Sequence, residues 1–165
     1  MAGEDRRAAR VALFPLPFQG HMSPMLQLAG ALHARGLAVT VLHTRFNALH
    51  PARHPEFRFV EVPDGVPANV AAAGRIIDVI LAMNAAMEAS PAPVRAALAS
   101  AMLAGDDEEA GAAACLFIDG NLLAVQRVAA GLGLPSLVLR TGSAALQGIP
   151  SSPRSVSPSH QDLIL

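Results

Sequence analysis

The fold is decided by one stretch near the N-terminus, Val11-Ala-Leu-Phe-Pro-Leu-Pro-Phe-Gln-Gly-His-Met-Ser-Pro-Met25. Residues 11–14 form an uninterrupted apolar run, which predicts a short strand with helices over both of its faces. Pro15, Pro17 and Gly20 end this run and predict a tight loop. The stretch therefore begins as a buried strand and turns sharply after it.

A helix is expected directly after this loop. Ser23 is a typical N-cap, and Pro24 suits the first helical position, where its missing N–H removes no hydrogen bond. Gly36 is expected to end the helix, whose apolar residues recur at helical spacing as Met25, Leu28, Ala29 and Leu32. His21 then lies in a strand-to-helix loop before a helix N-terminus, where open α/β sheets bind ligands.

Composition limits the kind of protein this can be. The 165 residues suffice for one domain with a proper core, and the 52% hydrophobic and 15% charged residues indicate a globular chain. The net charge is −1, all twelve basic residues are arginines, and tryptophan and tyrosine are absent. The sequence thus has neither a basic stripe nor interleaved aromatic residues, and we expect no nucleic-acid partner.

The single cysteine and the apolar segments bear on compartment and metal binding. Cys115 lies in an apolar run, which favours a buried structural thiol over a nucleophile and excludes an internal disulfide framework. The N-terminal apolar run is too short for a signal peptide, and no run approaches the ~20 residues of a membrane span. We therefore expect a cytoplasmic protein without a membrane span. No metal site is expected from three histidines without a cysteine partner: His43, His50 and His54.

The remaining elements predict an α/β fold with a Rossmann-like parallel sheet flanked by helices, because strands and helices alternate along the chain. Further strands are expected at residues 37–43, 57–62, 115–118 and 137–139. Helices are expected at residues 71–89, from Pro93 onward, and from Asn121 to Ala130. The predicted organisation is a disordered tail at residues 1–9, a domain at 10–146 and an irregular Ser/Pro-rich tail at 147–165.

Three polar residues directly follow apolar strands: His21, Asp119 and Thr141. Because the carboxyl ends of parallel strands share one edge of a sheet, these residues can form one site. An aspartate bonded to one imidazole nitrogen fixes the tautomer and leaves the other nitrogen as a base. The nearby helix N-terminus opposes protonation of the ring. Such a pair suits removal of a proton from a substrate hydroxyl, which contributes on the order of 10²–10⁴ in rate.

Plainer interpretations of the same residues remain open. His21 can be a loop histidine bonded to the backbone, Asp119 can merely cap the following helix, and Thr141 can be an ordinary turn hydroxyl.

Five segments carry a family resemblance, namely residues 14–25, 37–47, 57–65, 115–119 and 132–143. They occur in order across residues 10–146. In these segments the sequence resembles the N-terminal domain of plant-type UDP-dependent glycosyltransferases. That resemblance implies the GT-B arrangement, in which two Rossmann-like domains face each other across a cleft.

The resemblance also implies an activity. It is the inverting transfer of a hexose, usually glucose, from a UDP-sugar to a small hydroxylated secondary-metabolite acceptor. His21 matches the base and Asp119 the carboxylate that orients it. The resemblance places Gly20 and Thr141 beside the donor sugar, and Phe18 and Gln19 beside the acceptor. It implies no metal and no cofactor, with UDP-glucose as the expected co-substrate.

The sequence departs from the family in two respects. Residues 120–123 read Gly-Asn-Leu-Leu where many relatives have aromatic residues, so the acceptor is not inferred by analogy. The family's C-terminal UDP-sugar-binding domain is not represented in the 165 residues, and we expect little transfer by this chain alone. The alternative is a catalytically inactive fragment that binds an acceptor-like ligand or pairs with a full-length relative. An unrelated α/β nucleotide-binding domain is disfavoured because no Gly-rich phosphate loop occurs.

Overall fold

The computed structural model describes residues 9–102 and 113–141. These form a five-stranded sheet in the order β3-β2-β1-β4-β5, with every neighbouring pair parallel. In chain order the strands are β1 Arg10–Phe14, β2 Ala38–Thr44, β3 Arg58–Val62, β4 Ala113–Asp119 and β5 Ser136–Leu139. The predicted α/β fold class with a parallel sheet is therefore confirmed.

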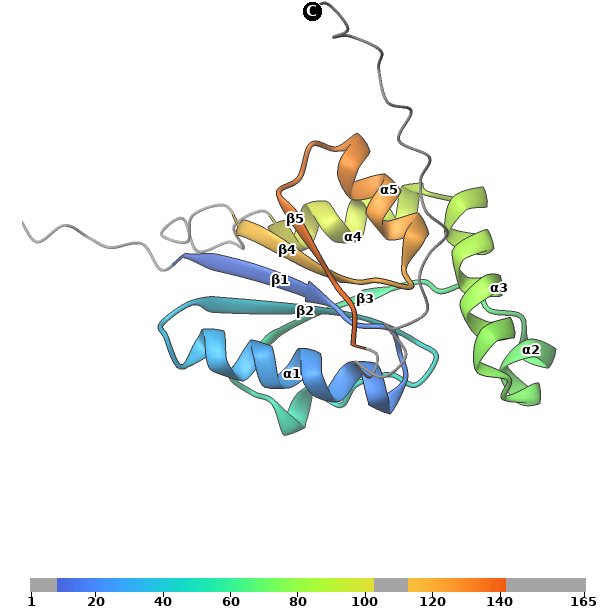
Figure 1. Cartoon of the computed structure of the whole chain (residues 1–165), viewed down its shortest axis with the longest axis horizontal. Helices are drawn as coiled ribbons and strands as arrows, with labels where there is room; N and C mark the ends of the chain where they lie inside the picture. The colour runs from blue at the N-terminus through green and yellow to red at the C-terminus, as the bar shows by residue number, and fades with distance from the viewer. Residues whose placement is uncertain (1–8, 103–112, 142–165) are drawn as a thin grey trace, which may run out of the picture.

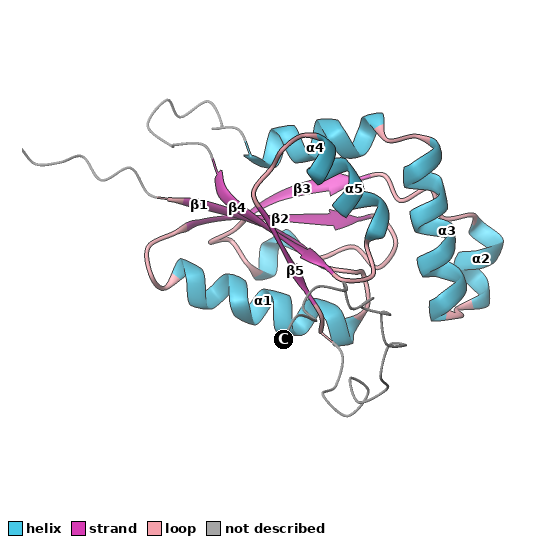
Figure 2. Ribbon diagram, turned by 45° about the horizontal axis from the view of Figure 1, so that its top comes forward, coloured by secondary structure: helices cyan, strands magenta, loops and turns pink. Residues whose placement is uncertain are grey.

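Helices cover both faces of the sheet (Figure 1, Figure 2). One helix packs on the first face and two pack on the second. Two more lie toward the carboxyl ends of the strands, where α3 packs on α5 and α2 packs on α3. In chain order the helices are α1 Gln19–His33, α2 Ala68–Ala73, α3 Ile76–Ala89, α4 Ala92–Met102 and α5 Leu123–Gly131. A short 3-10 turn, η1 Pro51–Arg53, interrupts the connection between β2 and β3.

The core has two parts, one on each side of the sheet. All five residues of β1 are buried, and the uninterrupted apolar run at 11–14 predicts this for four of them. Alternate residues face opposite sides, so Phe14 joins the larger cluster under α3, α4 and α5, while Leu13 joins the smaller cluster under α1. The sheet's central strand is thereby fixed from both faces, and the loop that follows it has a rigid base.

The first helix begins earlier than predicted. It starts at Gln19, so His21 lies in its first turn and not in a preceding loop. The carbonyl of Phe18 accepts hydrogen bonds from the N–H groups of His21 and Met22, both at 2.8 Å, and this nucleates the helix without a side-chain cap. The expected N-cap, Ser23, instead accepts a hydrogen bond from Gln19 through its side chain, at 2.9 Å.

Pro24 suits a first helical position but does not occupy one. It lies inside α1, where it cannot supply the N–H that would bond to the Gly20 carbonyl. The loss is confined to one hydrogen bond near the helix start, and the helix continues through it.

Two other boundaries differ from the sequence prediction. Residues 71–89 were expected as one helix, but Gly74 adopts a left-handed conformation with φ +67° and separates α2 from α3. The cap position of α5 is Leu122 and not Asn121. The predicted tail at 147–165, the boundary at residue 146 and most of the N-terminal tail lie outside the described residues.

Candidate active site

Three side chains meet at the carboxyl edge of the sheet. His21 from the first turn of α1 places Nδ1 2.8 Å from Oδ2 of Asp119, the last residue of β4. Thr141, just after β5, places Oγ1 2.6 Å from the same nitrogen and 3.3 Å from the same carboxylate oxygen. These residues lie 98 and 120 positions from His21 in the chain, and the parallel sheet brings them together.

The hydrogen bonds assign the proton on the ring. A carboxylate only accepts, so Nδ1 of His21 carries the hydrogen and donates it to Asp119. The Thr141 hydroxyl donates to the same carboxylate, with its oxygen beside the Nδ1–H group. In the neutral ring this leaves the lone pair on Nε2, and none of the described residues hydrogen-bonds to that nitrogen. The Asp119 side chain is 1% exposed and that of His21 23%, so the carboxylate is enclosed while the ring remains accessible.

The turn after β4 holds the carboxylate in place. The second oxygen of Asp119, Oδ1, accepts a hydrogen bond from the N–H of Asn121 at 2.9 Å. The backbone carbonyl of Asp119 accepts from the N–H of Leu122 at 3.0 Å and from Nε2 of Gln126 at 3.1 Å. Asp119 thus also stabilises its own turn, but it does not cap α5, whose cap position is Leu122, and Oδ2 remains directed at His21.

Asn84 is a further residue of this network that the sequence did not reveal. From the middle of α3, its Nδ2 donates to the Asn121 carbonyl at 2.8 Å. Its Oδ1 accepts from the N–H of Ala124 at 2.9 Å, and so caps α5 from another helix. The only sequence signal was an asparagine inside an apolar helix, a position that this residue type disfavours.

The residues expected near the substrates lie at the start of α1. Gln19 and Gly20 are exposed as its first two residues, and a Cβ on Gly20 would meet no atom within 4 Å. Phe18 is partly buried and packs edge-to-face on Phe46, with ring centroids 5.7 Å apart. Phe46 was not singled out from the sequence, and it extends the apolar surface around Phe18.

The loop that carries Phe46 is fixed by three hydrogen bonds. The N–H of Phe46 donates to Oδ2 of Asp64 at 2.9 Å, and its carbonyl accepts from the Thr44 hydroxyl at 3.1 Å. Asn47 donates through Nδ2 to the carbonyl of Pro17 at 3.0 Å, which ties this loop to the one before α1. Both loops at this part of the edge are therefore preorganised.

The other candidate groups lie away from this triad. His43 packs edge-to-face on Phe59 and His54 stacks on Phe57. Within residues 9–102 and 113–141, no three His, Cys, Asp or Glu side chains are grouped to hold a metal ion. In the same ranges, no helix has the length and apolar character needed to cross a membrane. Cys115 is only partly buried and not the fully buried thiol that its apolar run predicts. This partial burial still raises the pKa of the thiol, which disfavours the reactive thiolate.

Comparison with known sequences identifies the class of protein. The chain is 46% identical over 142 residues to a DIMBOA UDP-glucosyltransferase, BX8, of Zea mays, which covers 82% of this chain and 30% of that protein. It is 38% identical over 138 residues to UDP-glycosyltransferase 76C4 of Arabidopsis thaliana, and this match covers 84% of this chain and 30% of that protein. No protein-family model matches the chain. The chain thus spans about 30% of the length of these relatives.

Solved structures agree with this assignment. Os79 from O. sativa, in complex with U2F and trichothecene, superposes with a TM-score of 0.59 at 26% identity, covering 82% of this chain and 30% of Os79. UGT71G1 of Medicago truncatula, complexed with UDP-glucose, has the same fold, with a TM-score of 0.60 at 16% identity. The match covers 88% of this chain and 32% of UGT71G1. The fold is therefore that of the N-terminal half of a GT-B glycosyltransferase. The predicted resemblance is confirmed, and this chain is a relative of the plant UDP-glycosyltransferases.

Proposed function

We propose that this chain provides the acceptor-activating part of a UDP-glycosyltransferase. The reaction is the transfer of a hexose, glucose, from a UDP-sugar to a hydroxyl of a small secondary-metabolite acceptor. The observation that carries the proposal is the 2.8 Å contact between Nδ1 of His21 and Asp119, since it leaves Nε2 as the basic nitrogen.

In this mechanism the acceptor hydroxyl donates a hydrogen bond to Nε2 of His21. Its proton moves to that nitrogen as the hydroxyl oxygen attacks the anomeric carbon from the face opposite UDP. The new C–O bond forms while the bond to the departing diphosphate breaks, which inverts the anomeric centre. Asp119 stabilises the imidazolium that results, and general-base catalysis of this kind supplies on the order of 10²–10⁴ in rate.

The substrates are assigned to the two sides of His21. Thr141 supports a donor sugar beside the ring because its hydroxyl lies 2.6 Å from Nδ1, and Gly20 leaves open space at the helix start. Phe18 and Gln19 are assigned to the acceptor, for which the Phe18–Phe46 pair offers an apolar surface. A maize relative named as a glucosyltransferase and a solved relative holding UDP-glucose support glucose as the donor sugar.

The proposal is tested by kinetics on a fused protein. The chain is joined to the remaining part of the maize BX8 protein and assayed with UDP-glucose and a panel of small hydroxylated acceptors. His21→Gln should reduce turnover by roughly 10²–10⁴, whereas His33→Gln at the other end of α1 serves as the matched control and should not. Unchanged turnover of the His21 variant, with a native circular dichroism spectrum, would remove His21 from the mechanism.

A second candidate is binding of an acceptor-like small molecule without turnover. It is favoured by the apolar Phe18–Phe46 pair, which offers a surface for such a ligand whether or not a sugar is transferred. The 165-residue chain would then gain thermal stability from a ligand but form no product from UDP-glucose. Product formation at the rate of the fused protein would contradict this candidate.

A further inference from the structure

One residue of the loop after β2, Asn47, has an unusual backbone conformation. Its φ is +50°, and among the non-glycine residues that the structure describes it alone has a positive φ. This left-handed region suits glycine, and asparagine adopts it more readily than most residues but still at a cost in free energy. Strained conformations of this kind persist only where the surrounding structure fixes them, and they cluster at functional sites.

The side chain of Asn47 links two loops. Its Nδ2 donates a hydrogen bond to the carbonyl of Pro17 at 3.0 Å, across 30 residues of sequence. Asn47 is exposed and Pro17 is buried, and within residues 9–102 and 113–141 no other group donates to this carbonyl. Loss of the amide would therefore leave the carbonyl without a partner in that part of the chain.

The Pro17 carbonyl belongs to the peptide unit that leads into α1. A peptide unit is planar, so its carbonyl and its N–H group turn together. Asn47 holds the carbonyl of this unit, and the Leu16 carbonyl holds its N–H, which is that of Phe18, at 2.8 Å. The orientation of this peptide is thus fixed from both sides.

This peptide in turn positions the first turn of α1. The Phe18 carbonyl accepts hydrogen bonds from the N–H groups of His21 and Met22, both at 2.8 Å. The helix start has no side-chain cap hydrogen bond, so the bond from Asn47 is what holds the entering segment from outside the helix. A turn of the Pro17–Phe18 peptide would be passed on to His21 and would move its ring relative to the sheet edge.

The loop that carries Asn47 is itself anchored to the sheet. Just before it, Phe46 bonds through its N–H to Asp64 and through its carbonyl to the hydroxyl of Thr44, which is 1% exposed. Just after it, the N–H of Ala48 donates to the carbonyl three residues earlier at 3.2 Å. Hydrogen bonds on both sides of Asn47 therefore hold its amide against the Pro17 carbonyl.

We propose that Asn47 is a positioning residue for the proposed transfer reaction. Through the Pro17 carbonyl it fixes where His21 lies relative to the acceptor hydroxyl, so the proposal rests on the proposed role of His21 as the base. A displacement of about 1 Å can cost about 10² in rate, and a misplaced base affects the transition state and not substrate binding. Loss of the Asn47 amide should therefore lower kcat and leave the KM for UDP-glucose unchanged.

The test compares two variants of the protein fused to the remaining part of the maize BX8 protein. Asn47→Gly removes the amide and adopts the positive φ without strain, whereas Asn47→Ala removes the same amide and retains the strain. Both should lower kcat by roughly tenfold to a hundredfold, and Asn47→Ala should have the lower Tm. A purely conformational role of Asn47 predicts instead that Asn47→Gly keeps the kcat of the parent.

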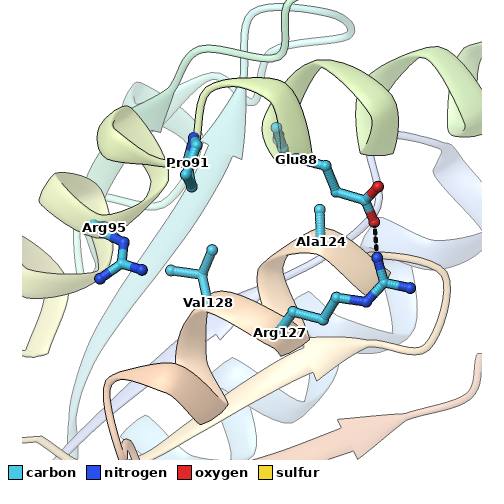
Figure 3. Close-up of a pocket in the computed structure, with 7 residues that line it drawn as sticks. Glu88, Pro91, Arg95, Ala124, Arg127 and Val128 are labelled. Carbon is cyan, nitrogen blue, oxygen red and sulfur yellow. Dashed lines mark hydrogen bonds and ion pairs between the residues drawn. The ribbon is translucent and has the colours of Figure 1, made fainter.

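Two controls separate this effect from a general loosening of the chain. Ala48→Gly adds the freedom of a glycine at the next, exposed position of the same loop and should leave kcat unchanged. Arg127→Gln breaks a different link between two elements, the exposed ion pair of α5 with Glu88 of α3 (Figure 3), and should also leave kcat unchanged.

Amide hydrogen exchange of the 165-residue chain gives a readout that needs no activity. The N–H groups of His21 and Met22 should exchange at least roughly tenfold faster in Asn47→Gly than in the parent, while those of β1 and β4 should not change. The proposal is overturned if Asn47→Gly has the kcat of the parent, or if these two amides exchange no faster in it. A failure of the proposed function is seen separately, as undiminished turnover of the His21→Gln variant.

Discussion

Asn84→Ala should lower the free energy of unfolding by about 2 kcal/mol, because Asn84 ties α3 to the turn that carries Asp119. The N–H of Ala124 loses its acceptor in a residue that is 1% exposed, which costs about 2 kcal/mol. The bond to the Asn121 carbonyl is exposed and its loss costs about 0.5 kcal/mol. Alanine's higher helix propensity in α3 returns about 0.5 kcal/mol.

Two variants make this prediction specific. Asn84→Asp keeps an oxygen for the Ala124 N–H but replaces the Nδ2 donor with a carboxylate oxygen that faces the carbonyls of Asn121 and Ile80, so it should restore only part of the lost stability. Asn69→Ala makes the same substitution at an exposed position of α2 and should change the free energy of unfolding by less than about 0.5 kcal/mol.

Urea unfolding followed by far-ultraviolet circular dichroism is the suitable assay, since the chain has no tryptophan or tyrosine to report by fluorescence. A loss below about 0.5 kcal/mol for Asn84→Ala would place it among ordinary surface substitutions. The assignment of Asn84 as the residue that holds the Asp119 turn would then be refuted.

Two further predictions concern packing and the thiol. Gly65→Ala should cost about 3 kcal/mol, because Gly65 has φ +63° and an added Cβ would lie 2.6 Å from Cβ of Ala86. Gly74→Ala has a similar φ of +67° but open space and should cost only about 1 kcal/mol, so equal shifts in Tm would contradict the packing argument. Because burial raises the pKa of Cys115, iodoacetamide should alkylate the folded chain more slowly than the urea-unfolded chain at mildly alkaline pH, with a rate that keeps rising as pH increases. Equal rates in the two states would show an unhindered thiol of ordinary pKa.

The sheet and the meeting of the three polar side chains were accessible from the sequence for a single physical reason. Asp119 ends β4, Thr141 follows β5 by two residues, and His21 lies in the first turn of the helix after β1. Parallel strands end at one edge of the sheet, so the sequence order alone places these residues at the same edge. Their chemical roles remain predictions that kinetics must test.

Local boundaries were harder because several residue types permit more than one arrangement. Ser23 and Pro24 are typical of a helix start, yet α1 begins at Gln19, five residues before Pro24. The Phe18 carbonyl accepts the first hydrogen bonds of this helix. Gly74 read as part of an alanine-rich helix, although its left-handed conformation divides that helix in two. In both cases the local residue types are compatible with the predicted helix boundary, but the folded chain has the boundary at a different residue.

Contacts between distant elements could not be predicted from one sequence. Asn84 bonds to the turn after β4 across 37 residues, and Phe46 meets Phe18 from a different loop. The packing of α3 and α4 on α5 likewise joins segments far apart in the chain, and no local pattern encodes it.

The central claim is that Asp119 holds the proton on Nδ1 of His21 and leaves Nε2 as the base. The most direct measurement is the pair of imidazole ¹⁵N chemical shifts of His21, assigned with the His21→Gln variant and recorded where the ring is neutral. The account predicts a protonated, pyrrole-type Nδ1 and an unprotonated, pyridine-type Nε2, with the Nδ1–H preference lost in Asp119→Asn. A proton on Nε2 in the parent chain, or the same tautomer in both proteins, would contradict it.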